Sequence, residues 1–206
     1  MVQTNLKKKV DILGFLYKLS NIQKKYIAIS LLTLLSFLGK IIGINLIFDI
    51  KLTLSSVFIF IILKLFGLKW ALISAVLVNG VDILFVEQIT EPVLVFLEVM
   101  AVGIVFEFKK KNIILLDAAY WLLVGLAIVG HSIYTSHGEI KIEIISSFFI
   151  YLIVGIFNTM LADVFYTYVP HERYLVIDGN LRRPPTLIAF MVHLSIAAII
   201  GPFMIY

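Results

Sequence analysis

The chain has 206 residues, of which 61% are hydrophobic and only 15% are charged. An average soluble domain has roughly 45–50% apolar and about 25% charged residues, so the composition excludes that class and predicts an integral membrane protein. Cysteine is absent, which excludes a disulfide framework, a cysteine zinc site and a thiol nucleophile. The net charge of +4 does not predict a nucleic-acid partner, because the lysines lie between apolar runs and not along one solvated face.

The first 25 residues form a basic segment that we expect to stay in the cytoplasm. Within it, "VDILGFLYKLS" (10–20) lies between lysines and places apolar residues near one helical face. This segment could be an interfacial helix or an ordinary cytoplasmic tail. No small-residue cleavage site precedes Lys40, which favours an uncleaved anchor over a signal peptide.

Beyond this tail, apolar segments follow one another to the end of the chain. A helix needs about 20 apolar residues to cross a bilayer. We predict one membrane domain (26–206), an all-α bundle of about seven transmembrane helices. The second is short and could be a partial crossing, which would leave six. The expected spans are Tyr26–Phe48, Leu52–Phe66, Trp70–Val86, Val93–Phe108, Ile113–Val129, Ile144–Val169 and Thr186–Ile205.

The placement of positive charge predicts how the chain threads the membrane. With seven spans, all but three of the 17 Lys and Arg residues lie on one side, the exceptions being Lys40, Lys51 and Lys141. Positive charge in short loops stays in the cytoplasm, so the N-terminus is expected inside and Tyr206 outside.

Several polar residues interrupt the expected spans. A charged side chain at the bilayer centre costs roughly 2.5–3.5 kcal/mol on insertion scales, so such residues usually face the bundle interior and suggest a functional site. Glu98 and Asp117 belong to neighbouring spans that are joined by the basic turn 109–111 and should pack as an antiparallel hairpin. The two side chains should project from these helices at different depths. Near mid-membrane, Glu98 must be protonated, hydrated or paired with a cation such as Lys40. Further candidates are Asp82, Asp163, Asn79 and Asn158.

A purely structural role is the alternative for each of these residues. Asp117 and Asp163 could extend toward nearby cations at the cytoplasmic surface. Tyr120 and Trp121 are more typical of packing or interface anchors than of ligand contacts. The small residues Gly103 and "GLAIVG" (125–130) favour close helix packing.

Catalytic motifs are absent from the sequence. It has no G-x-x-x-x-G-K-[ST] phosphate loop, no H-E-x-x-H zinc helix and no G-x-S-x-G elbow. His131 and His137 lie six residues apart in an expected outer loop, a pattern more typical of solvated histidines than of a metal site, and His193 is expected to be a hydrogen-bonded helix residue. We therefore expect no enzyme activity, no metal and no cofactor.

Three stretches carry a family resemblance. They are "GINLIFDIKLTLSSVFIFIILKLFGLKWALISAVL" (43–77), "EPVLVFLEVMAVGIVFEFKKKNIILLDAAYWLLVG" (91–125) and "VGIFNTMLA" (154–162). In this order, they resemble the N-terminal membrane-associated sensor region of bacterial histidine kinases and diguanylate cyclases. The resemblance covers most of residues 26–205. It implies that Glu98, Asp117, Trp121 and Asn158 occupy the recurring polar positions of that family.

The resemblance also implies a function and partners. The chain would be a sensory input module in the bacterial cytoplasmic membrane, with no catalytic domain of its own, working with attached signalling domains or with a partner kinase or cyclase. It would lie in the lipid bilayer, and it could form a homodimer. The family often has His-Pro where this chain has Glu91-Pro92, which weakens any transfer of outer-face chemistry.

The alternative function is the substrate-binding membrane component of an energy-coupling-factor importer for a vitamin or another small solute. Size, span count and an outward-facing pocket would suit it. Such components usually show an Ala-x-x-x-Ala docking surface, whereas the first span here offers only Ala28. In a third reading, a membrane scaffold, the buried acids only fix helix packing.

Overall fold

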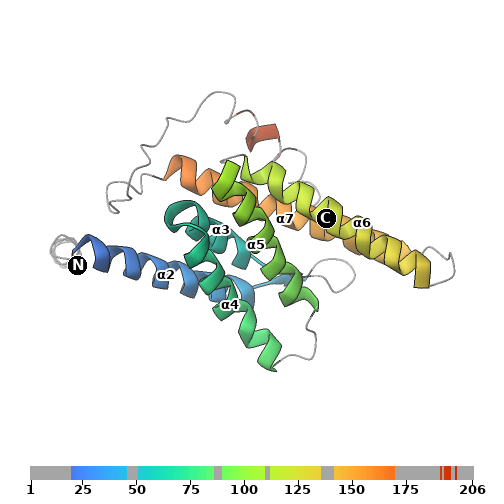
Figure 1. The fold of residues 1–206 in the computed structure, drawn as a ribbon, viewed down its shortest axis with the longest axis horizontal. Helices are drawn as coiled ribbons and strands as arrows, with labels where there is room; N and C mark the ends of the chain where they lie inside the picture. Colours follow the sequence, from blue (N-terminus) through green and yellow to red (C-terminus); the bar gives the residue numbers. More distant parts are fainter. Residues whose placement is uncertain are drawn as a thin grey trace, which may run out of the picture.

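The fold is a bundle of α-helices in a computed structural model (Figure 1). It describes residues 20–45, 51–85, 90–109, 112–135 and 142–169, together with residues 191, 193–195 and 198. The helices in these ranges are α2 (Asn21–Ile41), α3 (Ser55–Phe66), α4 (Leu68–Phe85), α5 (Thr90–Lys109), α6 (Ile113–Thr135) and α7 (Ile142–Tyr168). The tail 1–19 and most of the expected last span lie outside the described residues, but residues 191, 193–195 and 198 are helical.

The first helix differs from the expected span at both ends. It begins at Asn21 because Ser20 forms a capping box with Gln23: the Ser20 hydroxyl accepts from the Gln23 backbone N–H, and the Gln23 side chain accepts from the Ser20 N–H. It ends at Ile41 and does not continue to Phe48 as predicted. Instead β1 (Ile44–Asn45) pairs antiparallel with β2 (Lys51–Leu52). Apolar content alone could not distinguish this short hairpin from a longer helix.

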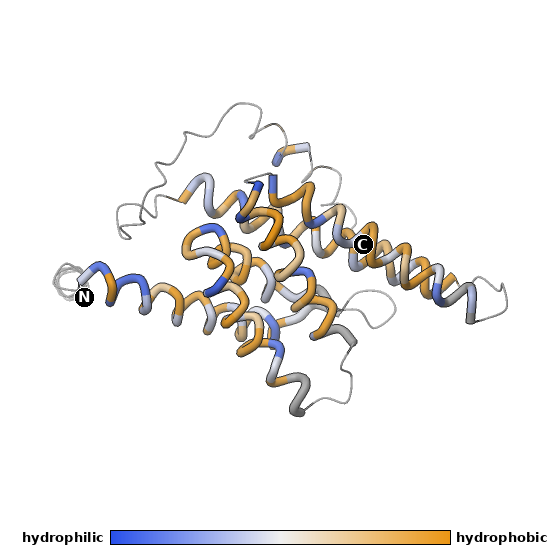
Figure 2. Tube along the Cα trace, viewed as in Figure 1, coloured by the Kyte–Doolittle hydropathy of each residue, from blue (hydrophilic) through white to orange (hydrophobic). Residues whose placement is uncertain are grey.

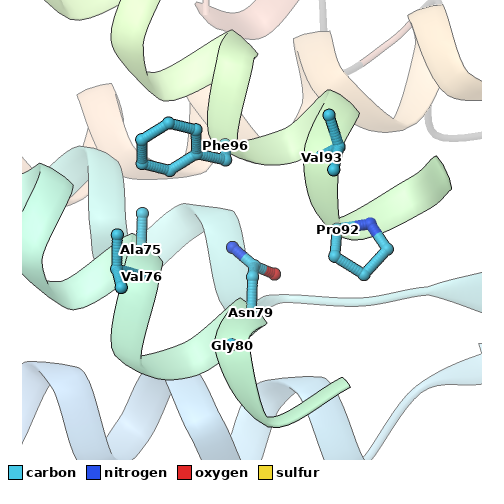
Figure 3. A pocket seen from close by; sticks show the side chains of 7 residues that line it. All are labelled: Ala75, Val76, Asn79, Gly80, Pro92, Val93 and Phe96. Atoms are coloured by element: carbon cyan, nitrogen blue, oxygen red, sulfur yellow. The ribbon is translucent and has the colours of Figure 1, made fainter. Parts of the chain in front are cut away.

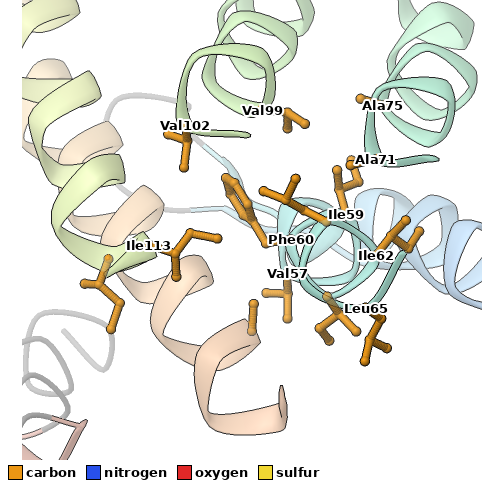
Figure 4. Packing of buried hydrophobic residues seen from close by; sticks show 14 of the residues in the cluster. Val57, Ile59, Phe60, Ile62, Leu65, Ala71, Ala75, Val99, Val102 and Ile113 are labelled. Atoms are coloured by element: carbon orange, nitrogen blue, oxygen red, sulfur yellow. The ribbon is translucent and has the colours of Figure 1, made fainter. Parts of the chain in front are cut away.

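The short helix α3 is the centre of the bundle. It begins at Ser55, three residues later than the predicted start at Leu52, which belongs to β2. Its 12 residues span about 18 Å at 1.5 Å per residue, less than the ~30 Å of a hydrocarbon core. Figure 4 shows α3 enclosed by apolar side chains of its neighbours, and Phe60 and Ile59 have no exposed surface. A helix that is hydrophobic on all sides is expected in such an interior position.

Contacts between the helices show that consecutive helices run in opposite directions. Along α2 and α4, Tyr26 contacts Trp70 and Lys40 binds Asn79, so these two helices are parallel. The remaining contacts give the same alternation, with α3, α5 and α7 running opposite to α2, α4 and α6. One end of the bundle therefore collects the start of α2, the α3–α4 turn and the α5–α6 turn. Lys24, Lys69 and Lys109 lie at this basic end.

The distribution of polarity is inverted relative to a soluble protein. Leucines point outward along α6, with Leu115 and Leu123 69% and 71% exposed, whereas carboxyl and amide side chains are buried inside. Figure 2 shows mainly hydrophobic colour along α6 and α7. Soluble monomers rarely expose so much contiguous apolar surface. Three of the described helices, α2, α6 and α7, are long and apolar enough to cross a membrane.

Glycines allow two of the close helix approaches that the sequence suggested. A Cβ on Gly125 of α6 would overlap the ring of Phe148 of α7, and one on Gly103 of α5 would lie 2.5 Å from a Leu68 methyl. Gly130 differs, because a Cβ there would meet no described atom within 4 Å. Gly125 and Gly103 thus have the predicted packing role, whereas Gly130 does not.

Candidate functional site

Four of the sequence-predicted residues meet inside the bundle, where α3, α5, α6 and α7 converge. Glu98 comes from α5, Asp117 and Trp121 from α6, and Asn158 from α7. Glu98 and Asn158 are 1% exposed, Trp121 is 4% exposed and Asp117 has no exposed surface. We call these four residues the central cluster. Their proximity agrees with the expected antiparallel α5–α6 hairpin, but residues 98 and 117 meet although they were expected at different depths.

A hydrogen bond from Trp121 to Glu98 joins α6 to α5. The indole Nε1–H donates to Glu98 Oε1 at 2.9 Å. Trp121 lies four residues after Asp117, so both side chains extend from the same face of α6. Gly155 of α7 makes room for the indole, because a Cβ at this position would overlap it and would lie 3.2 Å from Asp117 Oδ2. The geometry of this bond therefore depends on three helices.

Asp117 completes a pair of buried carboxyl groups with Glu98. The two side chains interact directly. Thr159 Oγ1 lies 3.2 Å from Asp117 Oδ2, and its hydroxyl donates either to this oxygen or to Gly155 O in its own helix. The other carboxyl oxygen, Asp117 Oδ1, has no hydrogen-bond partner among the described residues. Two negative charges so close together and out of water repel each other strongly. The pair is therefore suited to holding a proton or a hydrogen-bond donor.

Asn158 connects the cluster to the central helix. Its Nδ2 donates to Thr53 O at 3.0 Å and to Ser56 Oγ at 2.9 Å, while its Oδ1 is buried with no partner in the described chain. A polar cavity of about 20 Å³ lies among Ser56, Glu98, Trp121 and Asn158. This is room for about one water molecule, and it places a free acceptor beside the carboxyl pair.

A larger cavity adjoins the cluster on the side of the α6–α7 hairpin. It has a volume of about 350 Å³, and its walls are mainly apolar and aromatic. Trp121 and Tyr151 line both this cavity and the small polar one, and their rings are parallel to within 6° with centroids 5.6 Å apart. Small-molecule sites are commonly apolar cavities of about 300–1,000 Å³ with a few polar groups. Its remaining lining residues are Leu94, Gly125, Ile128, Ile144, Ser147 and Phe148.

The other two predicted site residues lie elsewhere. Lys40 Nζ donates to Asn79 Oδ1 at 2.8 Å and lies 3.5 Å from Val78 O, so it binds α4 and is not the partner of Glu98. The suggested Lys40–Glu98 pairing fails because Lys40 lies near the end of α2, against α4 and outside the central cluster. Asp82 belongs to α4, but its side chain lies outside the described residues.

Asp163 forms a second acidic site, partly buried and near the basic end. It makes an ion pair with Lys64 of α3, and its Oδ2 lies 2.8 Å from His193 Nε2. Lys64 also lies 4.4 Å from the centre of the Tyr166 ring. Asp163 thus reaches a cation near the basic end, as the structural alternative proposed, and that cation is Lys64. His193 is hydrogen-bonded, as expected.

Some residues of the site were not anticipated from the sequence. Thr159, Gly155, Tyr151 and Ser56 all contact the central cluster or line its cavities. The spacing of Tyr151, Gly155 and Thr159 at i, i+4 and i+8 gave a signal, because it places a single stripe on α7. Tyr120 was expected to be an anchor; its hydroxyl donates to Leu94 O at 2.8 Å and so binds α6 to α5.

The site offers a carboxyl pair, an indole donor, an amide oxygen without a partner among the described residues and an aromatic wall, and these groups can bind a ligand. Comparisons of the chain with known protein families, curated proteins and solved structures gave no match.

Proposed function

We propose that this chain is the membrane-embedded sensory input module of a bacterial signal-transduction protein, which binds a small molecule between α5, α6 and α7. The observation that carries the proposal is the contact between the 350 Å³ cavity and the Trp121–Glu98 hydrogen bond. The resemblance to kinase and cyclase sensor regions supports the signalling role.

The proposed signal starts at the shared wall of the two cavities. A ligand with a flat apolar body would pack against Trp121 and Tyr151, and a polar group on it would compete for Glu98. Either contact changes the hydrogen bond that joins α5 to α6. Since Gly155 leaves no spare room beside the indole, a movement of Trp121 would also shift α7. A ligand shifts an equilibrium only through such differential contacts.

Binding can be tested with the fluorescence of Trp121. The chain has two tryptophans, so Trp70→Phe leaves Trp121 as the only indole. We expect 4-bromophenol, a flat phenol whose bromine quenches indole emission, to quench this variant saturably in detergent. Adding Ser147→Phe, which narrows the cavity, should abolish saturation, while the exposed Glu107→Gln should not. Linear quenching that is equal in all three proteins would reject the binding site.

Signalling can be tested in the host cell. We expect chromosomal Glu98→Gln and Asp117→Asn to change the transcript profile in the direction of the gene deletion, or to lock it in one state. The control is Glu107→Gln on the same helix, which is exposed and should leave the profile unchanged. Profiles of both cluster variants that match the wild type under all growth conditions would contradict the sensor.

The cavity would also suit the alternative function, capture of a solute for an importer. The two functions predict different defects in the same strains. Loss of uptake and growth on a limiting solute, with no change in transcripts when the solute is plentiful, would favour the importer component. A transcript change without an uptake defect would favour the sensor.

We further propose seven crossings with the basic end in the cytoplasm. The alternating helix directions and the lysines at one end support this orientation. Because the chain has no cysteine, single cysteines report on topology directly. In intact cells, an impermeant maleimide should label Tyr134→Cys at the end of α6, and should label Lys69→Cys only after permeabilisation. The reverse pattern would invert the orientation.

A further inference from the structure

A second cavity lies between α4 and α5, separate from the central cluster. Its volume is about 190 Å³, and it is lined by Ala75, Val76, Asn79, Gly80, Pro92, Val93 and Phe96. Figure 3 shows the Asn79 amide projecting from α4 into this space, facing Pro92 and Phe96 of α5. Among the described lining residues, Asn79 alone has a polar side chain. Its Nδ2 has almost no accessible surface, so the open wall of the cavity is apolar and the amide lies just beneath it.

The orientation of this amide follows from its neighbour Lys40. The ammonium group of lysine has N–H donors and no acceptor. The Asn79 atom 2.8 Å from Lys40 Nζ is therefore the oxygen. The Nδ2 group is then on the other side of the amide, where it is buried and has no acceptor among the described residues. The bond to Lys40 also polarises the amide and strengthens Nδ2 as a donor.

A buried donor without an acceptor destabilises the structure. The described cavity offers no acceptor for it, since the side chains around Asn79 are aliphatic or aromatic. The cavity is several times larger than the ~30 Å³ that one water molecule occupies. An acceptor from a larger molecule is therefore the fitting partner for Nδ2.

The route into the cavity indicates what kind of molecule this is. Val76 and Val93, which line it, are 54% and 39% exposed, and the neighbouring Leu77 is 59% exposed. These side chains belong to the apolar outer surface of the bundle, which would face lipid. The cavity is thus accessible from the hydrocarbon region, and a soluble polar ligand would not reach it by this route.

We propose that the cavity between α4 and α5 binds a membrane-soluble molecule whose carbonyl oxygen displaces the apolar side chains covering Asn79 Nδ2 and accepts a hydrogen bond from it. The apolar remainder of the molecule lies against Val76, Val93 and Phe96. Two sources supply this chemistry in a membrane: the ester carbonyl of a phospholipid and the ring carbonyl of an isoprenoid quinone. The site does not depend on the function proposed for the central cluster.

The experiment measures binding to the purified full chain by native mass spectrometry in detergent. The probes are a diester phosphatidylglycerol, its diether analogue without carbonyls, and decylubiquinone. We expect the diester lipid or the quinone to bind, and Asn79→Leu to weaken that binding roughly tenfold, as the loss of one hydrogen bond of about 1.4 kcal/mol implies. Diester binding would identify a lipid site, and quinone binding a quinone site.

A second variant tests the site independently, in case Asn79→Leu does not fold. Gly80→Leu fills the cavity while leaving Asn79 and Lys40 intact, and it should weaken binding at least as much. Its matched control is Gly130→Leu on α6, since a Cβ at either glycine meets no described atom within 4 Å. The proposal is overturned if the diether lipid binds as well as the best carbonyl probe, if no probe binds, or if Gly80→Leu binds like Gly130→Leu.

Discussion

Acidic side chains lie against or on α7 at two places, one fully and one partly buried, and the bundle neutralises them in different ways. Asp163 is paired with the cation of Lys64 and with His193. Glu98 and Asp117 instead contact each other, the Trp121 N–H and the Thr159 hydroxyl, all within one buried cluster. A paired ion is a complete structural unit. The uncompensated carboxyl pair stores repulsion that a proton or a ligand can relieve, and we therefore place function there.

The largest effect is expected at the paired site. Lys64→Met should lower the free energy of unfolding by about 3 kcal/mol, because it leaves the partly buried Asp163 without its cation. The double variant Lys64→Met/Asp163→Leu should recover most of this loss. Unfolding in mixed micelles with increasing SDS measures both. A single variant as stable as the wild type would mean that water already neutralises Asp163.

The next effect concerns the space beside Trp121. Gly155→Ala should cost about 2 kcal/mol through overpacking, because its Cβ would overlap the indole. Trp121 emission should shift as its bond to Glu98 is lost. The same substitution at Gly130 has free space and should not destabilise the protein. Equal stability of the two variants would show that the α6–α7 contact is loose.

A smaller effect of opposite sign is expected at the carboxyl pair. Glu98→Gln should raise the free energy of unfolding by about 1 kcal/mol, because the amide can accept from Trp121 and also donate to Asp117. The exposed Glu107→Gln should leave it unchanged. The same SDS titration checks both. Destabilisation by Glu98→Gln would mean that the carboxyl pair is held by a favourable interaction, and the contrast with Asp163 would disappear.

The smallest effect is expected from Thr159→Val, at about 0.5–1 kcal/mol, the usual net contribution of one hydrogen bond. Thr159 can already bond within its own helix to Gly155 O, so its contact with Asp117 is partly replaceable. Thermal unfolding in detergent measures the change. A loss as large as that of Lys64→Met would place Thr159 among the main supports of Asp117.

The sequence predicted much of the fold and the core of the site. Apolar runs predicted all six described helices, since a helix is one of the few structures that satisfies all backbone hydrogen bonds of such a run in lipid. The basic turn 109–111 correctly predicted an antiparallel hairpin with Glu98 and Asp117 on neighbouring helices. The two residues were expected at different depths, whereas they meet in the structure. Gly125 and Gly103 were likewise read correctly as sites of close packing.

What the sequence missed depends on tertiary contacts. The β1–β2 pairing interrupts an apolar run whose composition also suits a helix. Lys40 could have met any acid in the bundle, and only the parallel packing of α2 on α4 gives it to Asn79. Thr159 and Ser56 resemble ordinary small packing residues until the helices are placed. Periodicity identifies a face of a helix but not which neighbour it meets.

The shortness of α3 has a consequence for biogenesis. A segment of 12 residues is too short to cross a bilayer by itself, so we do not expect it to leave the translocon as an independent span. It would remain beside α2 until α4 has been synthesised, and α3 and α4 would then partition into lipid together. In a nascent chain truncated before α4, a cysteine placed in α3 should therefore react with a water-soluble maleimide, although α2 anchors the product.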